Sequence, residues 1–287
     1  MDVVESFLSA VRSTLATLTH GAIALLIPAA FFIALAILLK RGEAIAAGRR
    51  AAHEVRTNLG LYFIDIVLVV PALGVLTVAV ASVMRALHLI VVPAEFWLMV
   101  GAPLTLLAAV FVGDFVGYWR HRLEHTRWLW PSHAIHHSDT EMTWLTLDRF
   151  HPINRVTTTI IDSSALLALG IPAWAAVANG LVRHYYGYFI HADLPWTYGA
   201  LSRVFVSPAM HRWHHARELR YAGTNFATVF SIFDQAFGTF RLPGPCDVPL
   251  GLEDDTGRGV AGQLAYPFKR WFGPLFSRKP AKAADQP

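Results

Sequence analysis

Long apolar runs alternate with short polar segments through the first two thirds of the chain. The run at 21–39 contains no charged side chain and nearly reaches the roughly 20 residues with which a helix crosses a bilayer. The run at 59–84 contains one acid near its start, Asp65, and the run at 96–112 continues as far as Trp119. Each of these three runs predicts a membrane-spanning helix.

A fourth apolar stretch, 156–190, is interrupted at its centre by the sequence Gly-Ile-Pro at 170–172. It predicts either a hairpin of two short helices or one re-entrant unit. The pattern therefore indicates an all-α integral membrane protein with about three to four membrane-spanning or re-entrant helical units and a cytoplasmic, histidine-rich helical cap. The predicted parts are N-terminal anchor helices with a basic loop at 1–95, a domain at 96–245 that contains the third and fourth apolar stretches, and an irregular cytoplasmic tail at 246–287 with a disordered end from 277.

Composition and charge agree with a membrane protein. The 287 residues are 54% hydrophobic and 15% charged, against roughly a quarter charged in soluble domains. The net charge of +4 is explained by basic loops, among them the segment 40–56, so nucleic acid is not an expected partner. The positive-inside rule places this loop in the cytoplasm, and the same topology brings the segments after 119 and after 190 to that face. We expect a bacterial inner-membrane location.

Three histidine motifs follow the apolar runs: HRLEH at 121–125, HAIHH at 133–137 and HRWHH at 211–215. Histidines spaced i, i+3 and i+4 share one face of a helix, so each motif can direct its imidazoles toward one point. About 0.03 copies of H-x-x-H-H are expected by chance in this composition, and the chain has two. Imidazole binds zinc, copper, iron and nickel, and eight imidazoles exceed the needs of one zinc ion. Two metal ions with four or five nitrogens each would use them all.

Other polar residues lie near the three motifs. His191 follows the fourth apolar stretch, and His184 is two helical turns earlier on the same face, so both are candidate ligands. Asp114 lies two turns before His121 and could accept a proton from a ligand imidazole or pair with Arg120 or Arg122. Further candidates to orient a ligand are His151, Asp193, Asp139, Asp148 and Asp234.

The order of the three motifs, with HHSDTEMTWLTLDRFHP and FIHADLP between them, resembles the fatty acid hydroxylase/sterol desaturase family. The segment TNFATVFSIFDQAFGTFR at 224–241 is similar to the stretch that follows the last histidine box in that family. The resemblance covers roughly residues 105–245 and implies that the domain at 96–245 is catalytic. It implies an integral membrane oxygenase with a histidine-bound dimetal centre, normally two iron ions, that uses O₂ to hydroxylate or desaturate a lipid C–H bond.

The resemblance also assigns site residues and partners. By position, the metal ligands would be His121, His125, His133, His136, His137, His191, His211, His214 and His215, with His184 as a further candidate. The substrate would enter from the bilayer. Some family members carry a fused haem-binding electron carrier, but this sequence has no HPGG-like haem motif, so a separate ferredoxin- or cytochrome-type donor is expected.

Two other readings of the sequence remain open. HRLEH satisfies H-x-x-E-H, the inverted zinc-peptidase motif, with His121 and His125 on zinc and Glu124 as base. That reading leaves the other two motifs unexplained. If Glu124 is not a catalytic base, we expect it at the surface of its helix, paired with a nearby arginine. A metal transporter would need ligands near the bilayer midplane, whereas these motifs follow the apolar runs. The identity of the lipid, the choice between hydroxylation and desaturation, and the oligomeric state have no signal in the sequence.

Overall fold

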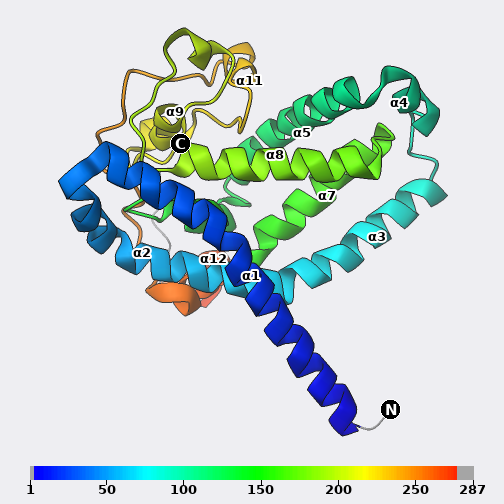
Figure 1. The fold of residues 1–287 in the computed structure, drawn as a ribbon, viewed down its shortest axis with the longest axis horizontal. Helices are drawn as coiled ribbons and strands as arrows, with labels where there is room; N and C mark the ends of the chain where they lie inside the picture. The colour runs from blue at the N-terminus through cyan, green and yellow to red at the C-terminus, as the bar shows by residue number, and fades with distance from the viewer. Residues whose placement is uncertain (1–2, 277–287) are drawn as a thin grey trace.

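The computed structural model describes residues 3–276, which form helices and connecting loops without a β-strand (Figure 1). The predicted disordered end at 277–287 lies outside the described residues. In chain order the helices are α1 (Val3–Lys40), η1 (Arg41–Glu43), α2 (Ala44–Ile64), η2 (Asp65–Val69), α3 (Val70–Ala86), α4 (Ala94–Val100), α5 (Ala102–Glu124), α6 (Trp130–His137), η3 (Trp144–Asp148), α7 (Pro152–Ala168), α8 (Ala173–His191), η4 (Gly199–Arg203), α9 (Pro208–His214), α10 (Leu219–Ala222), α11 (Ile232–Ala236) and α12 (Gly259–Phe276).

Two helical stretches are long and apolar enough to cross a membrane, Val11–Ala86 and Ala102–Glu124. The first of them contains two of the predicted runs, because α1 ends at the tight η1 turn and α2 returns from it (Figure 1). The return helix continues through a π-helical turn, η2, into α3. The described chain thus has the predicted all-helical membrane architecture.

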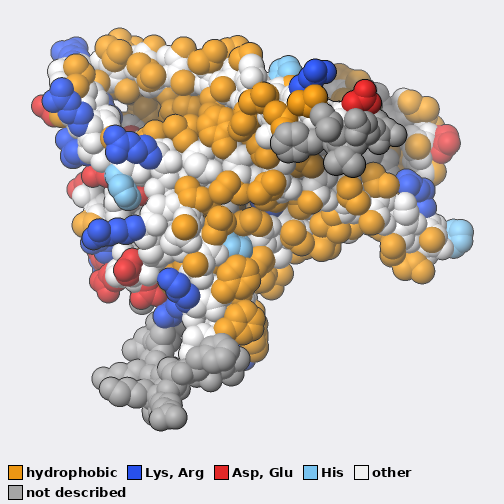
Figure 2. Space-filling view, turned by 90° about the horizontal axis from the view of Figure 1, so that it is seen from below, with side chains coloured by type: hydrophobic (Ala, Val, Ile, Leu, Met, Phe, Trp, Pro, Cys, Tyr) orange, Lys and Arg blue, Asp and Glu red, His pale blue; other side chains and the backbone are white. Residues whose placement is uncertain are grey.

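The outer surface of these helices is strongly apolar. Side chains such as Ile27 on α1 and Val75 on α3 are 82% and 73% exposed. Figure 2 shows hydrophobic side chains over most of one face, while Lys and Arg gather toward its left end. Exposed apolar area of this extent marks an interaction with membrane or protein, and here it covers the helices that can span a bilayer.

The fourth apolar stretch forms the predicted helical hairpin, α7 and α8. α7 packs against α3 and α5, and α8 packs against α5. The turn between them requires glycine at 170, whose φ is +59° and whose position would bring a Cβ within 2.1 Å of the Val92 carbonyl oxygen. The hairpin therefore lies beside the third apolar segment, α5, which ends in the first histidine motif.

The C-terminal tail differs from the expectation of irregular structure. Residues 246–258 are irregular, but α12 follows and packs against α2 and α6. Its Tyr266 is buried with Leu61, Ala134 and Ile135 in a core cluster. The Pro-, Gly- and acid-rich composition of the first part of the tail does not extend into this helix, which the histidine-bearing α6 needs as a packing partner.

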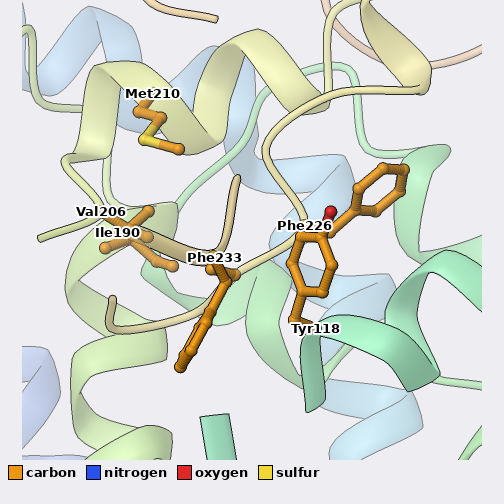
Figure 3. Close-up of a cluster of buried hydrophobic side chains, with 7 residues drawn as sticks. Tyr118, Ile190, Val206, Met210, Phe226 and Phe233 are labelled. Carbon is orange, nitrogen blue, oxygen red and sulfur yellow. The ribbon is translucent and has the colours of Figure 1, made fainter. Parts of the chain in front are cut away.

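A second core cluster attaches the loops around α9 and α11 to the ends of α5 and α8. Tyr118 of α5 and Ile190 of α8 pack with Met210 of α9 and with Phe226 and Phe233 (Figure 3). The Tyr118 hydroxyl also lies 2.9 Å from Thr239 Oγ1. This packing brings the third histidine motif, far along the chain, to the ends of the helices that carry the first motif and His191.

Candidate metal centre

Nine of the ten predicted ligand histidines come together in two groups. Within each group, one ring nitrogen from each histidine lies within 4.8 Å of the corresponding nitrogens of the others. The five-histidine group is His121, His125, His133, His137 and His214. The four-histidine group is His136, His191, His211 and His215.

The two groups divide the sequence motifs between them. Pairs spaced i and i+4, such as His133 with His137, join the same group, whereas His136 between them joins the other. Neighbouring helical positions are about 100° apart around the axis, so α6 can serve both groups only because they lie on adjacent sides of it. α9 divides in the same way, with His211 and His215 in one group and His214 in the other.

The protonation of these imidazoles can be assigned from the carbonyl oxygens that hold them. His121 Nδ1 lies 2.8 Å from Phe226 O, and His214 Nδ1 lies 2.6 Å from Thr224 O. Because a carbonyl oxygen only accepts, both Nδ1 atoms carry the proton and both Nε2 atoms present a lone pair. These two Nε2 atoms nevertheless lie 3.0 Å apart.

Two lone pairs at that separation repel unless a cation lies between them. Adjacent ligands at metal–nitrogen distances of 2.0–2.1 Å are separated by about 3 Å. The four-histidine group repeats the pattern: His191 Nδ1 donates to Gly187 O, and its Nε2 lies 3.1 Å from His136 Nε2 and 2.9 Å from His211 Nε2. The donor atoms of both groups therefore fit a bound metal ion.

Burial keeps the imidazoles in the form that metals bind. Seven of the nine histidines are at most 4% exposed. Burial lowers the pKa of His214 to about 4. It holds the pKa values of further members well below the usual range: His125, His133, His136, His137, His211 and His215. Neutral imidazoles at pH 7 are ready to ligate without releasing protons.

The loop that supplies two of these carbonyl oxygens is held by buried aspartates. Asp114 accepts hydrogen bonds from the backbone N–H groups of Thr228, Val229 and Phe230, at 3.1, 3.0 and 2.7 Å. Asp234 accepts from the N–H groups of Phe226 and Ala227, at 2.7 and 3.1 Å. The expected partners of Asp114, a ligand imidazole or the arginines at 120 and 122, are thus replaced by backbone N–H groups, with Arg183 as the nearest cation at 3.7 Å. Asp114 acts on the ligands through this loop.

Glu124 contacts the site more directly than its sequence position predicted. It pairs with Arg120 at 2.9 Å, as expected, but it is fully buried and not a surface acid. Its Oε2 also lies 3.6 Å from His133 Nδ1, and its Oε1 accepts from Thr157 at 3.1 Å. Because both oxygens are engaged, the geometry does not favour the zinc-peptidase reading, in which Glu124 would be a free base.

The remaining candidates take other positions. His184 is in neither histidine group, and its ring packs against Tyr188 with centroids 4.4 Å apart. His151 caps α7 through its Nδ1, which accepts from the N–H of Ile153. Asp193 pairs with Lys40 and with Arg212 at the surface. Asp139 accepts hydrogen bonds from Asn58 and Thr146. Asp148 accepts a hydrogen bond from Tyr188 and pairs with Arg155.

A cavity of about 680 Å³ reaches both histidine groups. His121 and His133 of one group and His136, His191 and His211 of the other line its wall. Away from the histidines it runs between α7 and α8 toward their connecting turn, with apolar walls that include Leu166, Ile171 and Val177. A long apolar molecule in this cavity would reach both groups.

The described chain is therefore a helical membrane protein with two histidine groups that can hold metal, at one end of an elongated cavity. Residues 106–239 match the model of the fatty acid hydroxylase family, in agreement with the resemblance that the histidine motifs carry. The matched region contains all nine grouped histidines.

The curated relatives include several lipid-modifying enzymes. Ornithine lipid hydroxylase OlsE of Rhizobium tropici is 32% identical over 167 residues, which cover 58% of this chain and 50% of that protein. Human alkylglycerol monooxygenase is 32% identical over 141 residues, 49% of this chain and 31% of that one. Methylsterol monooxygenase 2-2 of Arabidopsis thaliana is 27% identical over 154 residues, 51% of this chain and 55% of that one. The chain thus spans about half or less of these relatives. No solved structure matches it.

Proposed function

We propose that the protein is a membrane-bound, O₂-dependent oxygenase with two iron ions that oxidises a C–H bond of a lipid. The observation that carries this proposal is that histidines of both groups line one cavity with apolar walls. Hydroxylation is favoured over desaturation because the relatives OlsE and alkylglycerol monooxygenase are named a hydroxylase and a monooxygenase.

Iron in these groups would supply the redox chemistry with O₂ that amino-acid side chains lack. The five-histidine group and the four-histidine group would hold one ion each. Since no carboxylate belongs to either group, the ligands bring no negative charge of their own. The chain's part is to hold the imidazoles through the carbonyl oxygens of Thr224, Phe226 and Gly187, and to exclude water around them.

The cavity would select the substrate by shape over most of its length. Methylene groups offer no hydrogen-bonding handle, so the reacting carbon is chosen by where the chain is held. The apolar outer surface of α7 and α8 permits entry from the bilayer. Val177 and Leu181 on α8 are 64% and 54% exposed.

The proposal also includes the orientation of the protein in the membrane and the source of its electrons. The basic segment 40–56 lies where α1 turns into α2, and we place that turn and the histidine groups on the cytoplasmic side of a bacterial inner membrane. A separate ferredoxin- or cytochrome-type carrier would deliver electrons there.

Membranes that contain the protein test this function directly. With a reducing system and isotopically heavy O₂, a membrane lipid is expected to gain one labelled oxygen atom, detected by mass spectrometry of the lipid extract. A lipid that loses two hydrogens without gaining label would favour desaturation. The His214→Ala variant is the matched control and should give neither product. Lipids unchanged by the protein, or an added oxygen atom that carries no label, would contradict the proposal.

A further inference from the structure

The cavity contains a polar segment partway along its length. It is formed by Arg120 of α5, Asp162 of α7, and Asn179 and Arg183 of α8, all of which line the wall. Asp162 accepts from Arg120 Nε and from Arg183 Nη1, at 3.0 Å each. We call these four residues the polar station. A cavity that bound only hydrocarbon would not require charged and amide side chains in its wall.

The packing of α5 is shaped around the two α8 residues of the station. A Cβ on Gly113 would lie 2.5 Å from Asn179 Oδ1, and a Cβ on Gly117 would lie 2.0 Å from Arg183 Nη2. Both glycines are in the middle of a helix, where glycine is unfavourable. Glycine at these two positions lowers the stability of the helix but makes room for polar side chains between α5 and α8.

The station has unused hydrogen-bonding capacity. Asn179 is only 4% exposed, and its Oδ1 has no hydrogen-bond partner among the described residues. Arg183 Nε also lacks a hydrogen bond within the part of the chain that the structure describes. Buried polar atoms are almost always paired, and an unpaired one costs stability. An amide that lines a cavity in this state is suited to a ligand that supplies the missing partner.

The arginines that line the cavity around the station are already paired with carboxylates. Arg120 and Arg183 are its two guanidiniums, and they are already matched by three buried carboxylates, Asp162, Glu124 and Asp114. Arg155, the third arginine in the cavity wall, pairs with Asp65 at 3.1 Å, so among the described residues no guanidinium of the cavity is free to bind a carboxylate or phosphate. The ligand group that fits beside Asn179 is uncharged and forms hydrogen bonds.

The station also lies at a defined distance from the histidines. Arg183 and Asn179 precede His191 by two and by three helical turns on α8, about 12 and 18 Å along the axis at 1.5 Å per residue. The apolar end of the cavity, with Ile171 and Val177, lies beyond the station from His191. A bound lipid would place apolar chain in that end, its polar group at the station, and the reacting carbon at the histidines.

We propose that the polar station binds an uncharged hydrogen-bonding group within the lipid substrate, a hydroxyl or an amide, and thereby fixes which carbon reaches the metal centre. This inference rests on the proposed lipid oxygenase function and names the substrate class. Asn179 contacts the group, while Asp162 and the two arginines hold Asn179's surroundings in place.

The test measures binding to the purified, metal-loaded protein in detergent. The probes are a dialkyl secondary amide, an alkane of the same length and a fatty acid of the same length. The wild-type protein is expected to bind the amide about tenfold more tightly than the alkane, as one buried hydrogen bond allows, and the fatty acid no better than the alkane. Asn179→Leu should abolish the preference for the amide and leave alkane affinity and metal content unchanged.

A second variant and a second readout distinguish the loss of the hydrogen bond at Asn179 from a folding defect. Gly113→Ala crowds Asn179 from the opposite helix and should reduce the same preference. If a lipid is oxidised, Asn179→Leu should spread oxidation over several carbons where the wild-type protein oxidises one. Equal affinity of the wild-type protein for amide and alkane, or a preference for the fatty acid, would overturn the ligand-binding role proposed for the polar station. A protein that prefers the amide but never oxidises a lipid would instead overturn the proposed oxygenase function.

Discussion

Replacing His214 with alanine is expected to remove one metal ion per chain, and replacing His136 is expected to remove the other. The two residues belong to different groups, so each variant should retain the ion of the intact group. Oxygenase activity should fall by more than about a hundredfold in both, since even residues that only orient a ligand account for 10–100-fold. Metal content measured by inductively coupled plasma mass spectrometry, together with product formation, checks this prediction.

Two histidines outside the groups separate ligation from a general effect of losing an imidazole. His53 is exposed on α2, and His53→Ala should keep both metal ions and full activity. His184→Ala should also keep both ions, because His184 lies outside both groups. A His184 variant that loses metal as completely as His214→Ala, or a His214 variant with two bound ions, would show that the grouping is wrong.

Replacing Asp114 with alanine is expected to lower the free energy of unfolding by about 3 kcal/mol, the scale for leaving buried polar partners uncompensated. Three backbone N–H groups lose their acceptor, and Arg183 loses an ion-pair partner at 3.7 Å. The loop that these N–H groups belong to also presents Phe226 O to His121. Metal affinity should therefore fall by about 10–100-fold, as measured by competition with a chelator alongside thermal unfolding in detergent.

Asp193→Ala is the matched control for Asp114. It removes the same side chain from a surface ion pair with Lys40 and Arg212, where the side chain of Asp193 is 46% exposed. Such pairs contribute at most about 1 kcal/mol, and metal affinity should not change. Equal losses in the two variants, or an Asp114 variant with undiminished metal affinity, would contradict the role assigned to the loop.

The histidine spacing predicted much of the site because helical periodicity acts over short range. His121 with His125, and His211 with His215, share a face at i and i+4, and each pair stays within one group. The spacing did not separate His136 from its neighbours, because that depends on where α8 and α9 lie in space. The position of His191 at the end of the hairpin was a useful signal, whereas His184, on the same helical face, lines the cavity but belongs to neither histidine group.

The supporting residues were harder to predict, because their partners are far apart in sequence. Asp114 was assigned to side chains within two turns, but its partners are backbone N–H groups more than a hundred residues later. Glu124 was expected at the surface, yet α7 and α6 cover it so that it contacts Thr157 and His133. A single sequence contains local periodicity, but tertiary contacts decide which face of α5 is buried.

The metal content of the wild-type protein tests the central claim most directly. The protein would be purified in detergent without added metal or chelator, and iron and zinc would be counted per chain. Two iron ions per chain are predicted, one for each histidine group. One zinc ion with no second metal would contradict the dimetal oxygenase and favour the zinc-peptidase interpretation of the H-x-x-E-H motif at 121–125.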